Sequence, residues 1–180
     1  PVSGPYKFGS GSLENLDSSW SQEMLTNAAL VTTNDSTNSG YEINFWLYPT
    51  VDSVDRSIFY SVDSTGAAGT VKMGISDSNR ITWATNGSSL TSTGTINNND
   101  WNWIQMAHNG STVRLTVNSD SNSAVLGEAT PASPVANVGD KIFFGRDSNS
   151  ALLPSFNKAF IGYIDNYRIN VNDSNAGVPS

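Results

Sequence analysis

The feature that most constrains the fold is a hydrophobic period of two, clearest in the stretch YEINFWLYP that ends at Pro49. One side of this stretch carries Ile43, Phe45 and Leu47, and the other side begins with Glu42. Alternation of this kind is typical of a β-strand, in which successive side chains point to opposite faces. Proline cannot donate to a strand ladder, so we expect the strand to end there.

Similar runs recur along the chain between clusters of Gly, Asn, Asp and Ser, which is the spacing of a β-sandwich. The Asn109-Gly110 pair lies between two of these runs and predicts a hairpin. We expect one helical turn over Ser19–Leu25, with Ser18 or Ser19 as its N-cap. The other runs are predicted strands, and the last three named are weaker: Ser57–Asp63, Val71–Ser76, Arg80–Ala84, Trp101–His108, Thr112–Asn118, Lys141–Arg146, Phe160–Ile169, Tyr6–Phe8, Leu13–Leu16 and Ala28–Val31.

The fold class predicted from these runs is all-β, with two antiparallel sheets packed as a sandwich. The core is expected to form from the apolar side of the alternating strands. Its predicted members are Ile43, Phe45, Leu47, Ile104, Met106, Leu115, Val117, Phe143 and Ile164.

The charge pattern excludes several kinds of partner. Only 14% of the residues are charged, the net charge is −7, and the Lys and Arg residues are scattered singly. Without a basic stripe, nucleic-acid binding by phosphate neutralisation is not expected. No apolar run reaches the roughly 18–20 residues of a membrane helix, so no membrane insertion is expected. The absence of cysteine excludes disulfides and Cys-based metal sites.

Catalytic residues are not expected. A Ser-His-Asp triad needs a histidine within reach, and the single histidine, His108, lies inside a predicted strand. Glycoside hydrolysis needs two carboxyl groups that flank one bond. The same-face neighbours of Glu42 are Asn44 and Trp46, and neither is an acid. We therefore expect a protein that is not an enzyme.

Calcium is the metal to consider, because hard oxygen ligands are abundant in the loops. Asp52, Asp55 and Asp63 cluster around one predicted strand connection. They form the candidate calcium site, although no cofactor is required by the fold.

Tryptophan side chains suggest a place for a sugar, because aromatic rings can stack on the C–H face of a sugar ring; core packing is the alternative role. Trp101 and Trp103 share one side of a predicted strand, and Ile104 and Met106 share the other. The pair Trp101 and Trp103 is the candidate glycan-binding platform, and we expect it to be exposed.

Taken together, four segments resemble the laminin-G-like, concanavalin A-like lectin/glucanase jelly roll. The order and spacing fit from about residue 5 to residue 170. The segments are Tyr6–Leu13 with its Phe-Gly step, Tyr41–Pro49, Trp103–Asn118 and Phe160–Ile169, the last with the sequence FIGYIDNYRI.

The closing segment is the most specific part of the resemblance. Gly162 allows close approach of a neighbouring backbone, and Asp165 and Arg168 can fix the strand end by charge-assisted hydrogen bonds. These three residues are interpreted as structural. The resemblance implies a single jelly-roll domain over residues 1–170, followed by a polar tail over residues 171–180. It indicates architecture better than role, because the fold serves lectins, adhesion modules, hydrolases and viral surface proteins.

Two functions follow as hypotheses. The chain begins with Pro1, shows no signal peptide or linker, and, if its polar tail is ordered, needs neighbours that hold it. The first hypothesis is therefore a phage virion structural protein, a capsid decoration, knob or fibre component on the virion surface. It would bind other virion proteins, form a homo-oligomer and contact glycans. The alternative is an extracellular, lectin-like carbohydrate-binding module of a bacterial adhesin or polysaccharide-degrading system.

Overall fold

The computed structural model describes residues 5, 7–9, 12–15, 21–25, 41–50, 54–62, 71–85, 88–108, 113–119, 125–129, 141–145 and 158–171. These residues form strands and connecting turns. The strands are β1 (Leu13–Asn15), β2 (Ser21–Leu25), β3 (Tyr41–Pro49), β4 (Arg56–Val62), β5 (Val71–Ile75), β6 (Ile81–Thr85), β7 (Ser88–Thr91), β8 (Asn102–His108), β9 (Val113–Ser119), β10 (Val125–Ala129), β11 (Lys141–Gly145) and β12 (Gly162–Val171).

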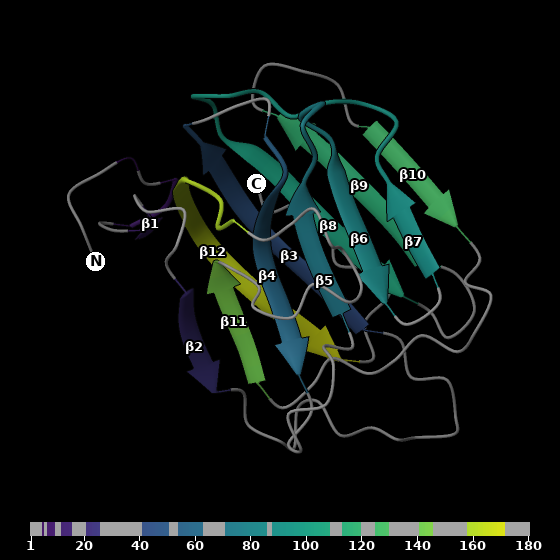
Figure 1. The fold of residues 1–180 in the computed structure, drawn as a ribbon, viewed down its shortest axis with the longest axis horizontal. Helices are drawn as coiled ribbons and strands as arrows, with labels where there is room; N and C mark the ends of the chain where they lie inside the picture. Colours follow the sequence, from purple (N-terminus) through teal and green to yellow (C-terminus); the bar gives the residue numbers. More distant parts are fainter. Residues whose placement is uncertain are drawn as a thin grey trace.

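The strands make two six-stranded sheets that lie face to face (Figure 1). Sheet I has the order β1-β12-β3-β8-β9-β10, and sheet II has the order β2-β11-β4-β5-β6-β7. Neighbouring strands are antiparallel in both sheets, including the predicted β8–β9 hairpin. The predicted fold class, an all-β antiparallel sandwich, is confirmed.

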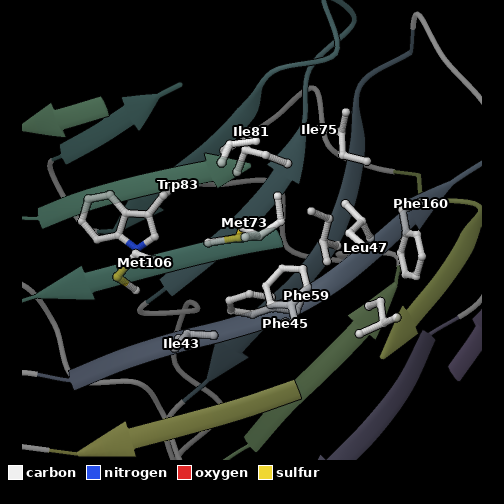
Figure 2. Packing of buried hydrophobic residues seen from close by; sticks show 14 of the residues in the cluster. Ile43, Phe45, Leu47, Phe59, Met73, Ile75, Ile81, Trp83, Met106 and Phe160 are labelled. Atoms are coloured by element: carbon white, nitrogen blue, oxygen red, sulfur yellow. The ribbon is translucent and has the colours of Figure 1, made fainter. Parts of the chain in front are cut away.

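The core lies between the sheets and is built from apolar side chains of strands in both sheets (Figure 2). The ring centroids of Phe45 from sheet I and Phe59 from sheet II are 6.2 Å apart, edge to face. Eight of the nine predicted core residues are fully or almost fully buried: Ile43, Phe45, Leu47, Ile104, Met106, Leu115, Val117 and Ile164. The side chain of the ninth, Phe143, is outside the described part of the structure, and its neighbour Phe144 is the residue that packs in the core.

A β-bulge in β12 decides which residues of this strand face the core. Asp165 pairs with Trp46 and Arg168 with Asn44, so two residues of β12 lie opposite the single residue between them on β3. Asn166 takes up the extra length with a φ of 53°. As a result Tyr167 packs into the core, with its ring centroid 4.8 Å from that of Phe144.

The predicted helical turn over Ser19–Leu25 is wrong. Ser21–Leu25 is strand β2, which pairs along its whole length with β11, and this pairing outweighs weak local propensity. Of the weaker strand predictions, Leu13–Leu16 corresponds to β1. Lys7 and Phe8 lie in a bend, and Ala28–Val31 lies outside the described residues. β12 continues to Val171, and the rest of the predicted tail lies outside them as well.

Candidate functional site

The outer side of sheet I carries a second cluster of rings, separate from the core. We call it the aromatic face, and its members are Trp46, Tyr48, Trp101, Trp103 and Tyr163. They face outward because Ile43, Phe45 and Leu47, the alternate residues of β3, fill the core.

The strand register arranges the aromatic face in two rows. In one row Trp46 lies opposite Trp103, and their ring centroids are 5.5 Å apart. In the other row the ring of Tyr48 lies between Trp101, at 5.4 Å, and Tyr163, at 6.0 Å. Trp46, Trp101 and Trp103 are buried, whereas Tyr48 and Tyr163 are half-buried and form the accessible part of the face.

A turn from the N-terminal region lies over Trp46. The Lys7 ammonium is 4.1 Å from the centroid of the Trp46 ring, and the Phe8 ring meets it edge-on at 6.2 Å. The turn is held by Asp165, whose Oδ2 accepts hydrogen bonds from the backbone N–H groups of Lys7 and Phe8, both at 2.8 Å. Phe8 itself is 39% exposed.

Buried polar groups lie next to the rings on the outer side of sheet I. Asn44 donates a hydrogen bond from Nδ2 to the Glu42 carboxylate, and both residues are buried. Seven buried side-chain atoms have no hydrogen-bond partner among the described residues, and three of them lie here: Asn44 Oδ1, Trp46 Nε1 and Trp103 Nε1. Buried polar atoms are usually hydrogen-bonded, so this cluster holds one acceptor and two donors whose hydrogen bonds are not made within the described residues.

Tyr163 joins the aromatic face to an acid on the edge strand β1. Its hydroxyl donates to Glu14 Oε1 at 2.7 Å. This hydrogen bond, together with burial and the negative charge of Glu14, raises the pKa of Tyr163, because each favours the protonated phenol.

The structure places Trp101 and Trp103 on one face and Ile104 and Met106 in the core, as predicted. The expectation that the two tryptophans are exposed is wrong: Trp103 has no exposed surface and Trp101 has 8%. Alternation assigns a residue to a face of the sheet but does not show whether that face is covered. Tyr48 and Tyr163 were not predicted as site residues, although both alternate with core residues in the same way.

The three residues interpreted as structural occupy different parts of β12. A Cβ on Gly162 would lie 2.0 Å from the carbonyl oxygen of Tyr48, so the close backbone approach is real. Asp165 fixes the N-terminal turn rather than the strand end. Arg168 is exposed, and its Nε donates to Asn166 Oδ1 at 2.9 Å across the bulge.

The candidate calcium ligands are only partly described. Asp55 Oδ1 accepts a hydrogen bond from the backbone N–H of Asp77 at 2.9 Å, and Asp52 and Asp63 lie outside the described residues. Within the part of the chain that the structure describes, no group of three His, Asp or Glu side chains could hold a metal ion. The calcium site therefore stays a prediction.

Two other predictions concern catalysis and membranes. His108 lies in β8 opposite Tyr41 and Val113, and its side chain is outside the description. No helix in the described ranges is long and apolar enough to cross a membrane.

The comparison with protein families covers most of the chain. A sequence model of the concanavalin A-like lectin/glucanases superfamily matches residues 23–171. The chain belongs to this family. Its two-sheet sandwich is the laminin-G-like jelly roll that the sequence resemblance implied. No curated protein sequence matches the chain.

Solved structures show the same fold at low identity. The LG1-3 region of the laminin alpha2 chain has a TM-score of 0.64 at 14% identity, over 86% of this chain and 30% of that one. Domains LG4-5 of the mouse laminin alpha1 chain have a TM-score of 0.64 at 10% identity, over 100% and 48%. The Ruminococcus gnavus IT-sialidase CBM40 bound to alpha2,3 sialyllactose has a TM-score of 0.61 at 10% identity, over 92% and 91%. The chain thus spans less than half the length of the two laminin chains.

Proposed function

We propose that the protein is an extracellular, non-enzymatic module that binds a carbohydrate through the aromatic face. The observation that carries this proposal is the cluster of rings on the outer side of sheet I, beside buried polar atoms that have no hydrogen-bond partner within the described ranges. Binding sites for small ligands combine apolar and aromatic walls with a few placed polar groups. The fold of a sialyllactose-binding module supports the proposal by analogy only, because fold does not determine function.

Tyr48 and Tyr163 are the rings that a sugar reaches first, because both are half-buried whereas the tryptophans are buried. Each ring can stack on the apolar face of a sugar. The carboxylate of Glu14, next to the Tyr163 hydroxyl, can accept a hydrogen bond from a sugar hydroxyl. Tyr48 and Tyr163 therefore replace the originally predicted pair, Trp101 and Trp103, as the first contacts.

A glycan array tests the proposal, using the full chain with calcium and with a chelator. Any glycan that binds is then titrated by calorimetry against wild-type protein, Tyr48→Ala and Tyr163→Ala. Each variant should weaken binding about tenfold or more, which corresponds to about 1.4 kcal/mol. Arg80→Ala is the control, because Arg80 is exposed on the β5–β6 turn of sheet II. An array without signal in both conditions, or equal affinity for all variants, would refute the proposal.

Calcium binding is tested with the same full chain, by measuring its melting temperature with calcium and with a chelator. If Asp52, Asp55 and Asp63 form a site, calcium raises the melting temperature by ligand linkage, and Asp55→Asn reduces that rise. An unchanged melting temperature on calcium addition rejects this site.

The virion hypothesis finds no support in the comparisons, which favour the carbohydrate-binding alternative. Its argument from ordered chain ends concerns residues outside the described ranges. Light scattering after size-exclusion chromatography distinguishes the two: a monomer that binds a soluble glycan supports the module, whereas a stable oligomer with a blank array supports assembly.

A further inference from the structure

The N-terminal turn over Trp46 is built as a small closed loop. Its base is joined by a hydrogen bond from Ser12 Oγ to the carbonyl oxygen of Pro5, at 2.7 Å. The tip holds Lys7 and Phe8 on the Trp46 ring. Gly9, next to the tip, has a φ of +68°, a conformation that glycine adopts readily. The base and the tip are therefore fastened by different contacts.

The tip lies partly at the surface and is fastened to β12 by one carboxylate. Asp165 Oδ2 accepts hydrogen bonds from the backbone N–H groups of Lys7 and Phe8. Phe8 is 39% exposed, and no atom lies within 4 Å of where a Cβ of Gly9 would be. Segments with few buried contacts open locally at low cost, while the rest of the fold stays intact.

The indole N–H of the ring beneath the tip lacks a hydrogen-bond partner within the described part of the chain. Trp46 is only 6% exposed, yet its Nε1 has no hydrogen-bond partner among the described residues, and neither has Nε1 of the adjacent Trp103. A core tryptophan of this strand would face sheet II, but Trp46 lies on the outer side of sheet I. Lys7 and Phe8 of the turn thus lie against this ring on the outer side of sheet I, away from the core.

We propose that the Lys7–Gly9 turn is a displaceable cover over Trp46, fastened by Asp165, and that its displacement opens a second stacking position beside Tyr48 and Tyr163. The ligand part of this inference rests on the proposed function; the cover does not. A sugar ring takes the place of the Lys7 ammonium on the indole, and a sugar hydroxyl accepts from Trp46 Nε1.

The cover is tested first without any glycan, by hydroxyl-radical labelling of the full chain and mass spectrometry of each tryptophan. Asp165→Ala should raise the labelling rate of Trp46 several-fold. Labelling of Trp83, which is fully buried in the core, should not change, so it reports any global unfolding. Asp77→Ala is the matched control, because Asp77 is exposed on the β5–β6 turn of sheet II and its carboxylate accepts a hydrogen bond from the adjacent Ser78 hydroxyl.

A second variant tests the cover without changing the strand that fastens it. Lys7→Ala/Phe8→Ala removes the side chains on the indole and leaves Asp165 and β12 unchanged, so Trp46 labelling should again rise. Equal Trp46 labelling in wild type and both variants overturns the cover. A rise in Trp83 labelling together with Trp46 labelling in both variants overturns it as well, because the whole fold would then have opened.

The ligand part is tested by affinity for any glycan found on the array. If the cover is closed in about nine molecules of ten, its loss in Asp165→Ala strengthens binding by about tenfold. Unchanged or weaker binding, with raised Trp46 labelling, shows that the cover exists but that no sugar enters beneath it. A blank array refutes the proposed function and leaves the labelling result valid.

Discussion

Gly162 and Tyr48 touch through their backbones, and the contact leaves no room for any side chain at position 162. A Cβ there would lie 2.0 Å from the Tyr48 carbonyl oxygen, and the φ of +145° is one that other residues rarely adopt. This contact joins the start of β12 to the end of β3, where Gly162 pairs with Pro49. It therefore fixes the position of Tyr163 on the aromatic face.

Gly162→Ala should destabilise the protein by about 2–6 kcal/mol, because backbone strain and overpacking each cost about 1–3 kcal/mol. Urea unfolding measures the loss. Gly9→Ala is the control: it also has positive φ but meets no atom within 4 Å, so it should cost only about 1–2 kcal/mol. Equal losses for the two variants would show that the contact with Tyr48 carries no cost.

The bulge at Asn166 gives a second prediction. Asn166 has a φ of 53°, which Gly adopts freely and a β-branched residue does not. Asn166→Val should therefore cost about 1–3 kcal/mol, and Asn166→Gly should be near neutral. Thermal unfolding of the two variants compares them directly, and a more stable Asn166→Val would contradict the bulge.

The strands in the middle of each sheet could be predicted from the sequence, because both of their neighbours and the opposing sheet favour one alternating pattern. β3 is the best example, since all three predicted core residues of that strand are fully buried. The strands that were missed, β2, β7 and β10, are edge strands. An edge strand has a single partner and needs less of its own apolar pattern, so its sequence carries a weaker signal.

The candidate site could be predicted only in part. Alternation correctly assigned Trp101 and Trp103 to one face, but their burial depends on contacts with distant residues. The relevant contacts are those of Tyr48 with Trp101 and of Trp46 with Trp103. The cover over Trp46 depends on two hydrogen bonds between residues 158 and 157 positions apart, which no local sequence pattern predicts. The motif residue Asp165 was recognised, and its partner was not.

The buried pair of Asn44 and Glu42 gives a third prediction. Asn44→Ala removes a donor to the buried carboxylate and should cost about 1.5–3 kcal/mol, the usual value of a hydrogen bond to a charged group. A double-mutant cycle with Glu42→Ala, which removes the acceptor, measures the coupling of the two residues in urea unfolding. Additive effects of the two changes would show that the hydrogen bond contributes nothing to stability.

The hydrogen bond between Tyr163 and Glu14 predicts a change in stability at alkaline pH. Because the pKa of Tyr163 is raised in the folded protein, its contribution is fully present below the unfolded value of about 10. The contribution is lost as the pH rises through the folded pKa, since the unfolded chain releases its proton first. Tyr163→Phe should therefore be less stable than wild type at neutral pH, and the difference should shrink above about pH 10.

Urea unfolding of both proteins across this pH range measures the difference, and phenolate absorbance follows the titration. Tyr48→Phe is the comparison, because it removes a hydroxyl from the neighbouring ring in the same row of the aromatic face and leaves the hydrogen bond between Tyr163 and Glu14 in place. Glu14→Gln keeps an acceptor but removes the charge, so it should lower the pKa of Tyr163 toward its ordinary value. A difference in unfolding free energy between wild type and Tyr163→Phe that stays constant through the alkaline range would contradict the prediction. It would mean that the hydrogen bond to Glu14 does not stabilise the protonated phenol.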